Sequence, residues 1–266
     1  MGVLSGRVAW ITGGGRGIGR AAALTLARAG ARVAVSARTR VEVDAVAAKA
    51  RHLGGSAESL TCDVSDWSQV IDTVGRIEST LGPIDILINN AGVLGPLARM
   101  WESPPQEWAS AIEINLIGAY HCARAVLPGM IERRRGSIVN ISSGAADFAG
   151  PNWTAYAASK AGLDHLTRNL AVELDGTGVR VNALHPGIIE TAMVRTLRTA
   201  APAQLPEHRR RFFEDVTAQG EVAAPETPGI IIAWLASDAT RDLSGEVVNA
   251  RDDPSLLAKA RAALNL

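Results

Sequence analysis

A tyrosine and a lysine stand four residues apart in the segment YAASK, residues 156–160. This spacing places two side chains on one face of a helix. A free tyrosine has a pKa near ~10, so a phenol that transfers protons at neutral pH needs a nearby cation to stabilise its phenolate. The ammonium of Lys160 could be that cation. The pair is therefore a candidate for acid–base catalysis, although a single Tyr-x-x-x-Lys pattern also arises by chance.

A glycine-rich turn near the N-terminus suggests a second kind of chemistry. The segment TGGGRGIG, residues 12–19, lies between an apolar strand-like run and an Ala-rich helical pattern. Glycines let the backbone approach a pyrophosphate, and the N-terminus of the following helix stabilises its negative charge. The spacing Gly13, Gly17, Gly19 departs from the ordinary G-x-G-x-x-G pattern, and a turn that binds nothing is the structural alternative. The strand–turn–helix context nevertheless favours a dinucleotide site.

The end of the second strand-like run bears on which dinucleotide binds. This region reads VAVSART, with Ala37 and Arg38 where an acidic residue would accept from a ribose 2′-hydroxyl. A guanidinium suits a 2′-phosphate through paired charge-assisted hydrogen bonds, and Arg16 could add a second positive charge. We therefore expect NADP(H) in preference to NAD(H). The alternative is that Arg38 lies on the surface with no part in binding.

Apolar, β-rich runs alternate with helical patterns along the chain. The runs cover residues 7–12, 32–37, 56–64, 84–89, 136–142, 179–186 and 246–249. Helical spacing in residues 17–30, 67–82 and 155–178 ends each time at a glycine that can terminate a helix. Such alternation indicates βαβ units. We expect a single α/β domain over residues 1–266, with a doubly wound (Rossmann-type) parallel sheet of seven strands and helices on both faces.

Two segments depart from this alternation. Residues 192–224 show no strand pattern and are too long for a plain connection, so we expect them to form a substrate lid. Phe212 and Phe213 would line the pocket or pack a lid helix on the body, and both alternatives stay open. The HRRR run at 208–211 would steer an anion or be a solvated helix face. Residues 254–266 form an Ala/Leu-rich C-terminal tail.

Composition excludes several classes of protein. Lys+Arg and Asp+Glu both total 27 in 266 residues, so no net charge attracts nucleic acid or a membrane. Cys62 and Cys122 lie in apolar stretches without C-x-x-C pairing, so we expect two core residues and no metal site. The N-terminus shows no signal-peptide pattern and no apolar run is long enough to span a bilayer, which makes a cytoplasmic protein the default expectation.

The motifs, taken in order, resemble the short-chain dehydrogenase/reductase family in its common single-domain form. The resemblance runs from about residue 4 to residue 249. It rests on the glycine turn at 12–19, Asp63 in CDV, NNAG at 89–92, Asn115, ISS ending at Ser143, Tyr156 with Lys160, and HPG followed by Thr191. Several ordered motifs are far more specific than any one of them. One departure is NARDDP after the last expected strand, where the family usually has D-G-G.

The resemblance implies catalytic roles for four residues. Ser143 would hydrogen-bond the substrate carbonyl, with Ser142 as the weaker choice. Tyr156 would be the general acid in reduction and the general base in oxidation. Lys160 would lower the tyrosine pKa and hold the nicotinamide ribose, and Asn115 would anchor a proton-relay water. The structural alternatives are a turn cap at Ser143 and a helix break at Asn115.

The expected cofactor contacts span the chain. Asp63 and Val64 would meet the adenine, residues 90–92 the adenosine-side ribose, and residues 186–191 the nicotinamide carboxamide; for Asp63 the alternative is a cap on the following helix. The full expected set is Gly13, Gly15, Arg16, Gly17, Ile18, Gly19, Arg38, Asp63, Val64, Asn90, Ala91, Gly92, Tyr156, Lys160, Pro186, Gly187, Ile189 and Thr191.

We therefore expect an NADP(H)-dependent oxidoreductase that interconverts a ketone or aldehyde with a secondary alcohol. The substrate pocket should be lined by Leu94, Gly95, Ala145, Phe148, Trp153, His185 and the 192–224 lid, in addition to Ser143 and Tyr156. Alternatives are a non-catalytic NADP-binding sensor and an NAD-dependent alcohol dehydrogenase. A nucleotide-sugar epimerase or dehydratase should have a longer C-terminal domain, and an enoyl reductase a wider spacing between tyrosine and lysine.

The sequence also bears on assembly. Residues 104–134 and 154–176 carry Ala/Leu/Val surface, and family members commonly pair these helices about a two-fold axis. We expect a homotetramer, with a homodimer as second choice because of the altered C-terminus.

Overall fold

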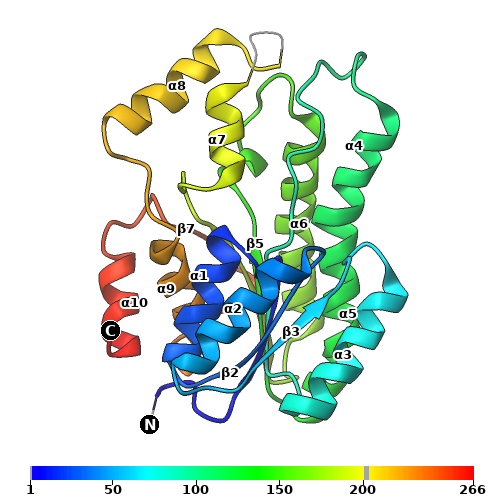
Figure 1. The fold of residues 1–266 in the computed structure, drawn as a ribbon, viewed down its shortest axis with the longest axis vertical. Helices are drawn as coiled ribbons and strands as arrows, with labels where there is room; N and C mark the ends of the chain where they lie inside the picture. Colours follow the sequence, from blue (N-terminus) through cyan, green and yellow to red (C-terminus); the bar gives the residue numbers. More distant parts are fainter. Residues whose placement is uncertain (1, 201–203) are drawn as a thin grey trace.

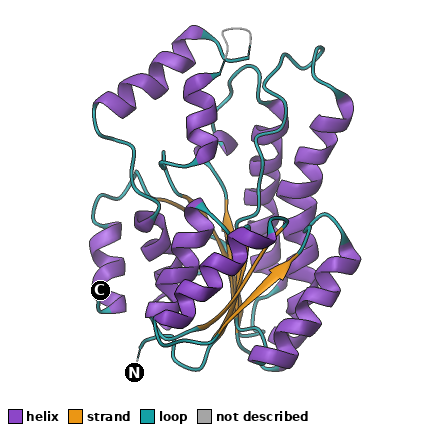
Figure 2. Ribbon diagram, viewed as in Figure 1, coloured by secondary structure: helices purple, strands orange, loops and turns teal. Residues whose placement is uncertain are grey.

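The computed structural model describes residues 2–200 and 204–266, apart from the side chains of His208 and Arg209. A sheet of seven parallel strands forms the centre of the protein (Figures 1 and 2). The strands are β1 (Val8–Thr12), β2 (Arg32–Ala37), β3 (Ala57–Thr61), β4 (Ile86–Asn89), β5 (Gly136–Ile141), β6 (Val179–His185) and β7 (Val247–Asn249). Their order is β3-β2-β1-β4-β5-β6-β7, which confirms the expected doubly wound sheet.

Helices cover both faces of the sheet, as expected (Figure 1). One face carries α1 (Gly17–Arg28), α2 (Arg40–His52), α9 (Glu226–Ala236) and α10 (Leu256–Leu264). The other carries α3 (Trp67–Leu81), α5 (Gly118–Glu132) and α6 (Thr154–Glu173), with α4 (Pro105–Ile112) packed on α6. The short elements are a π-helix η1 (Glu113–Ile117) and two 3₁₀ turns, η2 (Gly144–Ala146) and η3 (Asp238–Thr240).

Side chains along β1 point alternately to the two faces of the sheet, and each face has its own hydrophobic core. Ala9 and Ile11 face the core under α1 and α9, whereas Val8 and Trp10 face the core under α3 and α5. Cys62 and Cys122 are both free and buried in this second core, which confirms that they are core residues.

One strand is shorter than its sequence pattern. The expected run at 56–64 forms a strand only over β3, because β3 lies at the sheet edge and its one partner, β2, ends at Ala37. Cys62 donates one further backbone hydrogen bond to Ala37, and the chain then turns at Asp63, whose Oδ1 accepts from the backbone and the hydroxyl of Ser65. The residues that leave the edge strand therefore become available to a ligand.

The expected lid segment is mainly helical where it is described. It contains α7 (Ala192–Thr199) and α8 (Glu207–Ala218), which extend beyond the carboxyl ends of the strands in Figure 1. Phe213 is buried, and Phe212 is half-buried. The C-terminal tail forms α10, whose Leu256 and Leu264 pack in the core with α9. No helix in the described part of the chain is long and apolar enough to cross a membrane.

The buried indole of Trp10 gives a test of the fold. Its Nε1 donates to the Ser36 hydroxyl at 2.9 Å, and both side chains are buried. We expect Ser36→Ala to lower the free energy of unfolding by ~1–3 kcal/mol, because the indole N–H then lacks a partner. Urea denaturation measures the change, with Ser79→Ala on the exposed face of α3 as the control. Equal effects from the two variants would show that the Trp10 hydrogen bond contributes nothing.

Candidate active site

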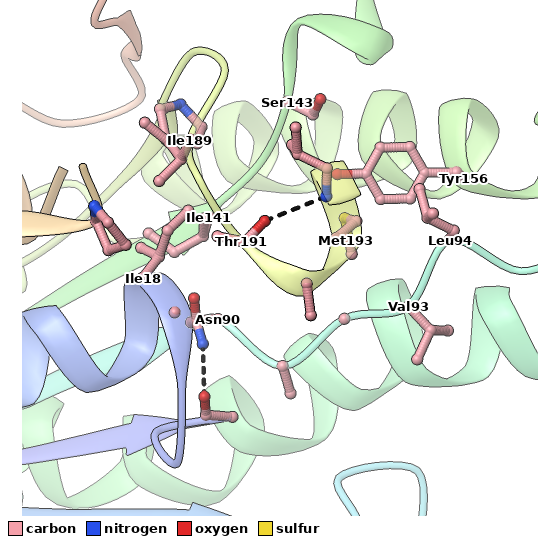
Figure 3. Close-up of a pocket in the computed structure, with 18 of the residues that line it drawn as sticks. Ile18, Asn90, Val93, Leu94, Ile141, Ser143, Tyr156, Ile189, Thr191 and Met193 are labelled. Carbon is pink, nitrogen blue, oxygen red and sulfur yellow. Dashed lines mark hydrogen bonds between the residues drawn. The ribbon is translucent and has the colours of Figure 1, made fainter. Parts of the chain in front are cut away.

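A pocket of about 1020 Å³ opens at the carboxyl ends of the strands (Figure 3). Its walls come from the loops after β1 to β7 and from α6, α7 and α8. The sheet order reverses between β1 and β4, and such a switch point is where open α/β sheets bind ligands. Most of the expected site residues therefore lie around one cavity.

The glycine turn is packed too closely for side chains. A Cβ on Gly19 would lie 2.4 Å from Asn90 Nδ2 and from the Gly13 carbonyl oxygen. Asn90 Nδ2 donates to the Thr12 and Gly13 carbonyls at 2.9 and 3.0 Å, which ties the loop after β4 to the turn (Figure 3). Arg16, the N-cap residue of α1, makes no capping hydrogen bond with its side chain. The first N–H groups of α1 and the positive end of its dipole suit a pyrophosphate, so the expected cofactor fits here.

The wall beside the turn carries charges of both signs. Arg16, Arg38 and Thr39 line the pocket and are exposed. Glu42, in the first turn of α2, also lines this wall and was not among the expected site residues. Its carboxylate lies 3.8 Å from the Arg16 guanidinium, and Gly15 packs directly against its Cβ. An acid in the first turn of a helix ordinarily stabilises the helix dipole, so no sequence signal marked Glu42 as a pocket residue.

One of the two residues expected to contact adenine also stabilises its own turn. Asp63 and Val64 line the pocket, but the Asp63 carboxylate also holds its own turn through Ser65. Asp66, rather than Asp63, caps α3, accepting from the backbone N–H groups of Ser68 and Gln69. The alternative of a helix cap at Asp63 is therefore wrong, and its contact with adenine stays a prediction.

Ser143 and Tyr156 meet at the other end of the pocket (Figure 3). Ser143 is the N-cap of η2, two residues after the end of β5, and its Oγ accepts from the Ala145 N–H at 3.2 Å. The turn cap is thus present at Ser143. Burial raises the pKa of the Tyr156 phenol, and the neighbouring Ser143 hydroxyl opposes this rise. Ser142 instead donates to the Lys160 carbonyl.

Lys160 is a buried ammonium, 4 % exposed. Its Nζ donates to the Ile141 carbonyl at 2.7 Å and lies 5.7 Å from the centroid of the Tyr156 ring. Burial lowers the pKa of Lys160 to about 8, and the charge of Asp164 opposes this effect. The expected lowering of the tyrosine pKa by Lys160 stays a prediction.

Asn115 lies behind the pocket wall, in the π-helix η1. Its Oδ1 accepts from the Val93 N–H at 2.8 Å, and its Nδ2 donates to the Val93 carbonyl and to Ser159. A Cβ on Gly92 would lie 3.3 Å from Asn115 Oδ1 and 3.7 Å from Lys160 Nζ. The helix break that we gave as the structural alternative for Asn115 is present as the π-helix η1. The Asn115 side chain also holds the loop after β4 through Val93. Its part in a proton relay stays a prediction.

The segment after β6 closes the far side of the pocket. Pro186, Gly187, Ile189 and Thr191 all line it, as expected. Gly187 has φ of 86°, and Thr191 Oγ1 accepts from the Val194 N–H to cap α7 (Figure 3). The chain that would meet the nicotinamide is thus continuous with the first helix of the expected lid.

The substrate end of the pocket is largely apolar. Leu94, Ala145, Phe148, Trp153 and His185 line it as expected. Gly95 does not: a Cβ there would lie 2.8 Å from Ala111 of α4, so this glycine packs against a helix instead. Met193 and Leu197 of the expected lid also line the pocket, together with Ile188 after β6. Phe212 and Phe213 both line the pocket and pack with the cluster around Tyr156, so their two expected roles coincide.

In the described part of the chain, no three His, Cys, Asp or Glu side chains are placed to hold a metal.

Comparison with known proteins gives consistent results. A family model described as short chain dehydrogenase matches residues 7–202. The 3-oxoacyl-[acyl-carrier-protein] reductase FabG of Thermotoga maritima is 36% identical over 247 residues, covering 92% of this chain and 96% of its own. Oxidoreductase UcpA of Salmonella typhimurium is 37% identical over 246 residues, covering 92% of this chain and 93% of its own.

Solved structures agree in fold. An NAD⁺-bound xylitol dehydrogenase superposes with a TM-score of 0.86 at 31% identity, covering 92% of this chain and 98% of its own. A levodione reductase superposes with a TM-score of 0.85 at 32% identity, covering 96% of this chain and 99% of its own.

The packing of the glycine turn can be tested directly. We expect Gly19→Ala to raise the dissociation constant of a reduced dinucleotide by about tenfold or more, equal to ~1.4 kcal/mol, because its methyl group would displace the turn. Fluorescence titration measures this constant. Gly75→Ala on α3 is the matched control, since no atom lies within 4 Å of its added Cβ. Unchanged binding in Gly19→Ala would place the dinucleotide elsewhere.

Proposed function

The chain belongs to the short-chain dehydrogenase/reductase family, and we propose that it interconverts a ketone or aldehyde with a secondary alcohol, using NADP(H). Family membership makes it an oxidoreductase with a nicotinamide cofactor. The single observation that carries the reaction class is that Ser143 and Tyr156 line the same end of the pocket, with buried Lys160 one helical turn further along α6.

Each of these side chains has a chemical task in carbonyl reduction. The cofactor, when bound, supplies or accepts the hydride. Negative charge develops on the carbonyl oxygen during reduction, and the Ser143 hydroxyl donates a hydrogen bond to it. Tyr156 gives its phenolic proton to that oxygen, and the Lys160 ammonium stabilises the phenolate that remains. In alcohol oxidation the same groups act in reverse, with the Tyr156 phenolate as the base.

The apolar walls favour a carbonyl compound with a hydrophobic or ring-bearing body. Trp153, Phe148, Met193 and Leu197 offer area for such a body, while polar groups concentrate near Ser143 and Tyr156. The similar proteins include reductases and a dehydrogenase, which supports the reaction class without selecting a substrate.

The choice of NADP(H) is supported by the wall next to the glycine turn. Ala37 places no carboxylate at the end of β2, and Arg16 and Arg38 offer charge of the correct sign for a 2′-phosphate. Glu42 weakens this preference, because its carboxylate lies beside Arg16 and would repel the phosphate. Together with the similar NAD⁺-bound enzyme, Glu42 favours an NAD-dependent alcohol dehydrogenase as the second candidate.

Assembly and location remain part of the proposal. Apolar side chains on η1 and α5, Ile117, Tyr120 and Ile131, are exposed, which supports pairing of chains through this surface into a homotetramer or homodimer. We place the enzyme in the cytoplasm, with a small-molecule substrate and neither nucleic acid nor membrane as partner.

The proton transfer is tested by Tyr156→Phe. We expect turnover of an accepted ketone to fall by about 10²-fold or more, because the ring stays and only the proton donor is lost. Dinucleotide affinity should persist within a few-fold. Tyr120→Phe, at the only other tyrosine, is the matched control and should keep wild-type turnover. Wild-type turnover in Tyr156→Phe would contradict the proposed reaction.

Cofactor preference is tested by the ratio of kcat/KM for NADPH to that for NADH on one ketone. Two charge-assisted contacts contribute ~1.5–3 kcal/mol, so Ala37→Asp/Arg38→Leu should move the ratio roughly ten- to hundredfold toward NADH. Glu42→Gln should move it roughly two- to fivefold toward NADPH, since a partly exposed charge is screened. A wild-type ratio at or below one would mean that Arg38 takes no part in selection.

A further inference from the structure

A buried hydrogen bond between two side chains joins α6 to β6. Asp164 lies on α6, His185 is the last residue of β6, and each is 2 % exposed. The Asp164 Oδ2 atom lies 2.8 Å from His185 Nε2. An ionised carboxylate only accepts hydrogen bonds, so Nε2 carries a proton and donates it to Oδ2. Among the described residues, this is the one hydrogen bond between α6 and β6.

This pair is not the cheapest way to fill the space between α6 and β6. The second carboxylate oxygen of Asp164, Oδ1, is also buried and has no hydrogen-bond partner in the described part of the chain. A buried carboxylate with an unpaired oxygen lowers stability, and apolar side chains of similar volume often fill such a space at no loss. The pair therefore calls for a task other than stability.

The other imidazole nitrogen contributes little to holding His185. Its Nδ1 lies 3.7 Å from a carboxylate oxygen of Asp147, which is too long for a hydrogen bond. The Asp147 side chain is 74 % exposed, so water and salt screen its charge. The hydrogen bond to Asp164 is therefore the contact that fixes the imidazole.

The two ends of this hydrogen bond lead to different parts of the proposed site. Asp164 lies two helical turns after Tyr156, the proposed proton donor. His185 directly precedes residues 186–191, which line the pocket and are expected to meet the nicotinamide. Carbonyl reduction delivers a proton and a hydride to the same C=O group. The distance between Tyr156 and residues 186–191 must therefore be set closely.

Other hydrogen bonds hold α6 to a different strand. Lys160 Nζ donates to the Ile141 carbonyl at 2.7 Å, and Asn140 Nδ2 donates to Thr167 Oγ1 at 2.9 Å. Ile141 and Asn140 belong to β5, the strand that leads to Ser143. These bonds set the position of α6 relative to β5 and leave its position relative to β6 to the remaining contacts.

We propose that Asp164 and His185 are positioning residues, whose hydrogen bond sets the distance between Tyr156 and residues 186–191. They act through α6 and β6 and not on the substrate. The inference rests on the proposed function, because these two parts of the site work together only when one carbonyl group receives both the proton and the hydride. Loss of the bond frees α6 to shift against β6, and a displacement of about 1 Å can slow such a transfer by about 10²-fold.

A double variant tests this without leaving a buried group unpaired. Asp164→Leu/His185→Phe replaces both partners by apolar side chains, a change that is often neutral for stability. We expect the single-turnover rate of hydride transfer to fall by about tenfold or more, with the dinucleotide dissociation constant within about threefold of the wild type. Stopped-flow absorbance of NADPH with an accepted ketone measures the rate. A slower reaction with NADPH deuterated at the transferred position shows that hydride transfer is the step observed.

Two further variants separate positioning from charge and from stability. Asp164→Asn keeps an oxygen that accepts from Nε2 and loses the charge, so its hydride rate should stay within about threefold of the wild type. Ser137→Ala is the structural control, because it removes a buried hydrogen bond to the Leu235 carbonyl at the opposite end of β5 from the pocket. It should lower the free energy of unfolding and leave the hydride rate unchanged.

The bond also has a signature that needs neither cofactor nor turnover. An imidazole N–H that is buried and bonded to a carboxylate exchanges slowly with water, so it gives a proton NMR signal in protein labelled with nitrogen-15 histidine. The sequence holds five histidines, and loss of a signal in His185→Gln assigns that of His185. We expect this signal in the wild type and in Asp164→Asn, and its loss or displacement in Asp164→Leu.

Two results would overturn the inference. One is a folded double variant with the wild-type hydride rate, and the other is an Asp164→Asn variant that slows as much as the double variant. If the double variant does not fold, His185→Phe alone removes the bond, and a wild-type rate there has the same meaning. Failure of the proposed function is distinguishable, because Tyr156→Phe would then turn over the ketone at the wild-type rate.

Discussion

The burial of one ammonium beside one phenol is the constraint on which the site depends. Lys160 leaves water almost completely, and its Nζ donates to the Ile141 carbonyl at the end of β5. This hydrogen bond requires α6 to pack closely on β5. Tyr156 and Lys160, the proposed catalytic residues on α6, are therefore held by the core of the protein and not by a surface loop.

The sheet places this site beside the proposed nucleotide site, which is built from other loops. Loops after β1, β2, β3 and β4 supply the glycine turn, the charged wall and the expected adenine contacts, whereas β5, β6 and the helices after them supply the catalytic and substrate ends. All strands run parallel, so all these loops emerge at one edge. Asn90 and Asn115 join the two halves, one tying the loop after β4 to the glycine turn and the other to α6.

Local pattern was sufficient for much of this arrangement. Strand–helix alternation predicted the seven-stranded sheet, and the residues of the glycine turn and YAASK predicted where the two ends of the pocket lie. Features set by contacts between distant segments escaped prediction. The proximity of Glu42 to Arg16 depends on how α2 meets the turn, and the pairing of Asp164 with His185 joins a helix to a strand 21 residues later. The predictions for Gly95 and for the end of β3 were wrong for the same reason. Gly95 packs against α4 and does not line the pocket, and β3 ends where its partner strand β2 ends.

The central claim is that the Ser143, Tyr156 and Lys160 group reduces a carbonyl compound. Its most direct test is a panel of ketones, aldehydes and quinones offered to the purified chain with NADPH and with NADH, following the loss of reduced-cofactor absorbance. The account predicts cofactor consumption with at least one class of carbonyl compound, faster with NADPH than with NADH. Tight dinucleotide binding without consumption by any carbonyl compound would contradict it, and would instead identify a non-catalytic dinucleotide sensor.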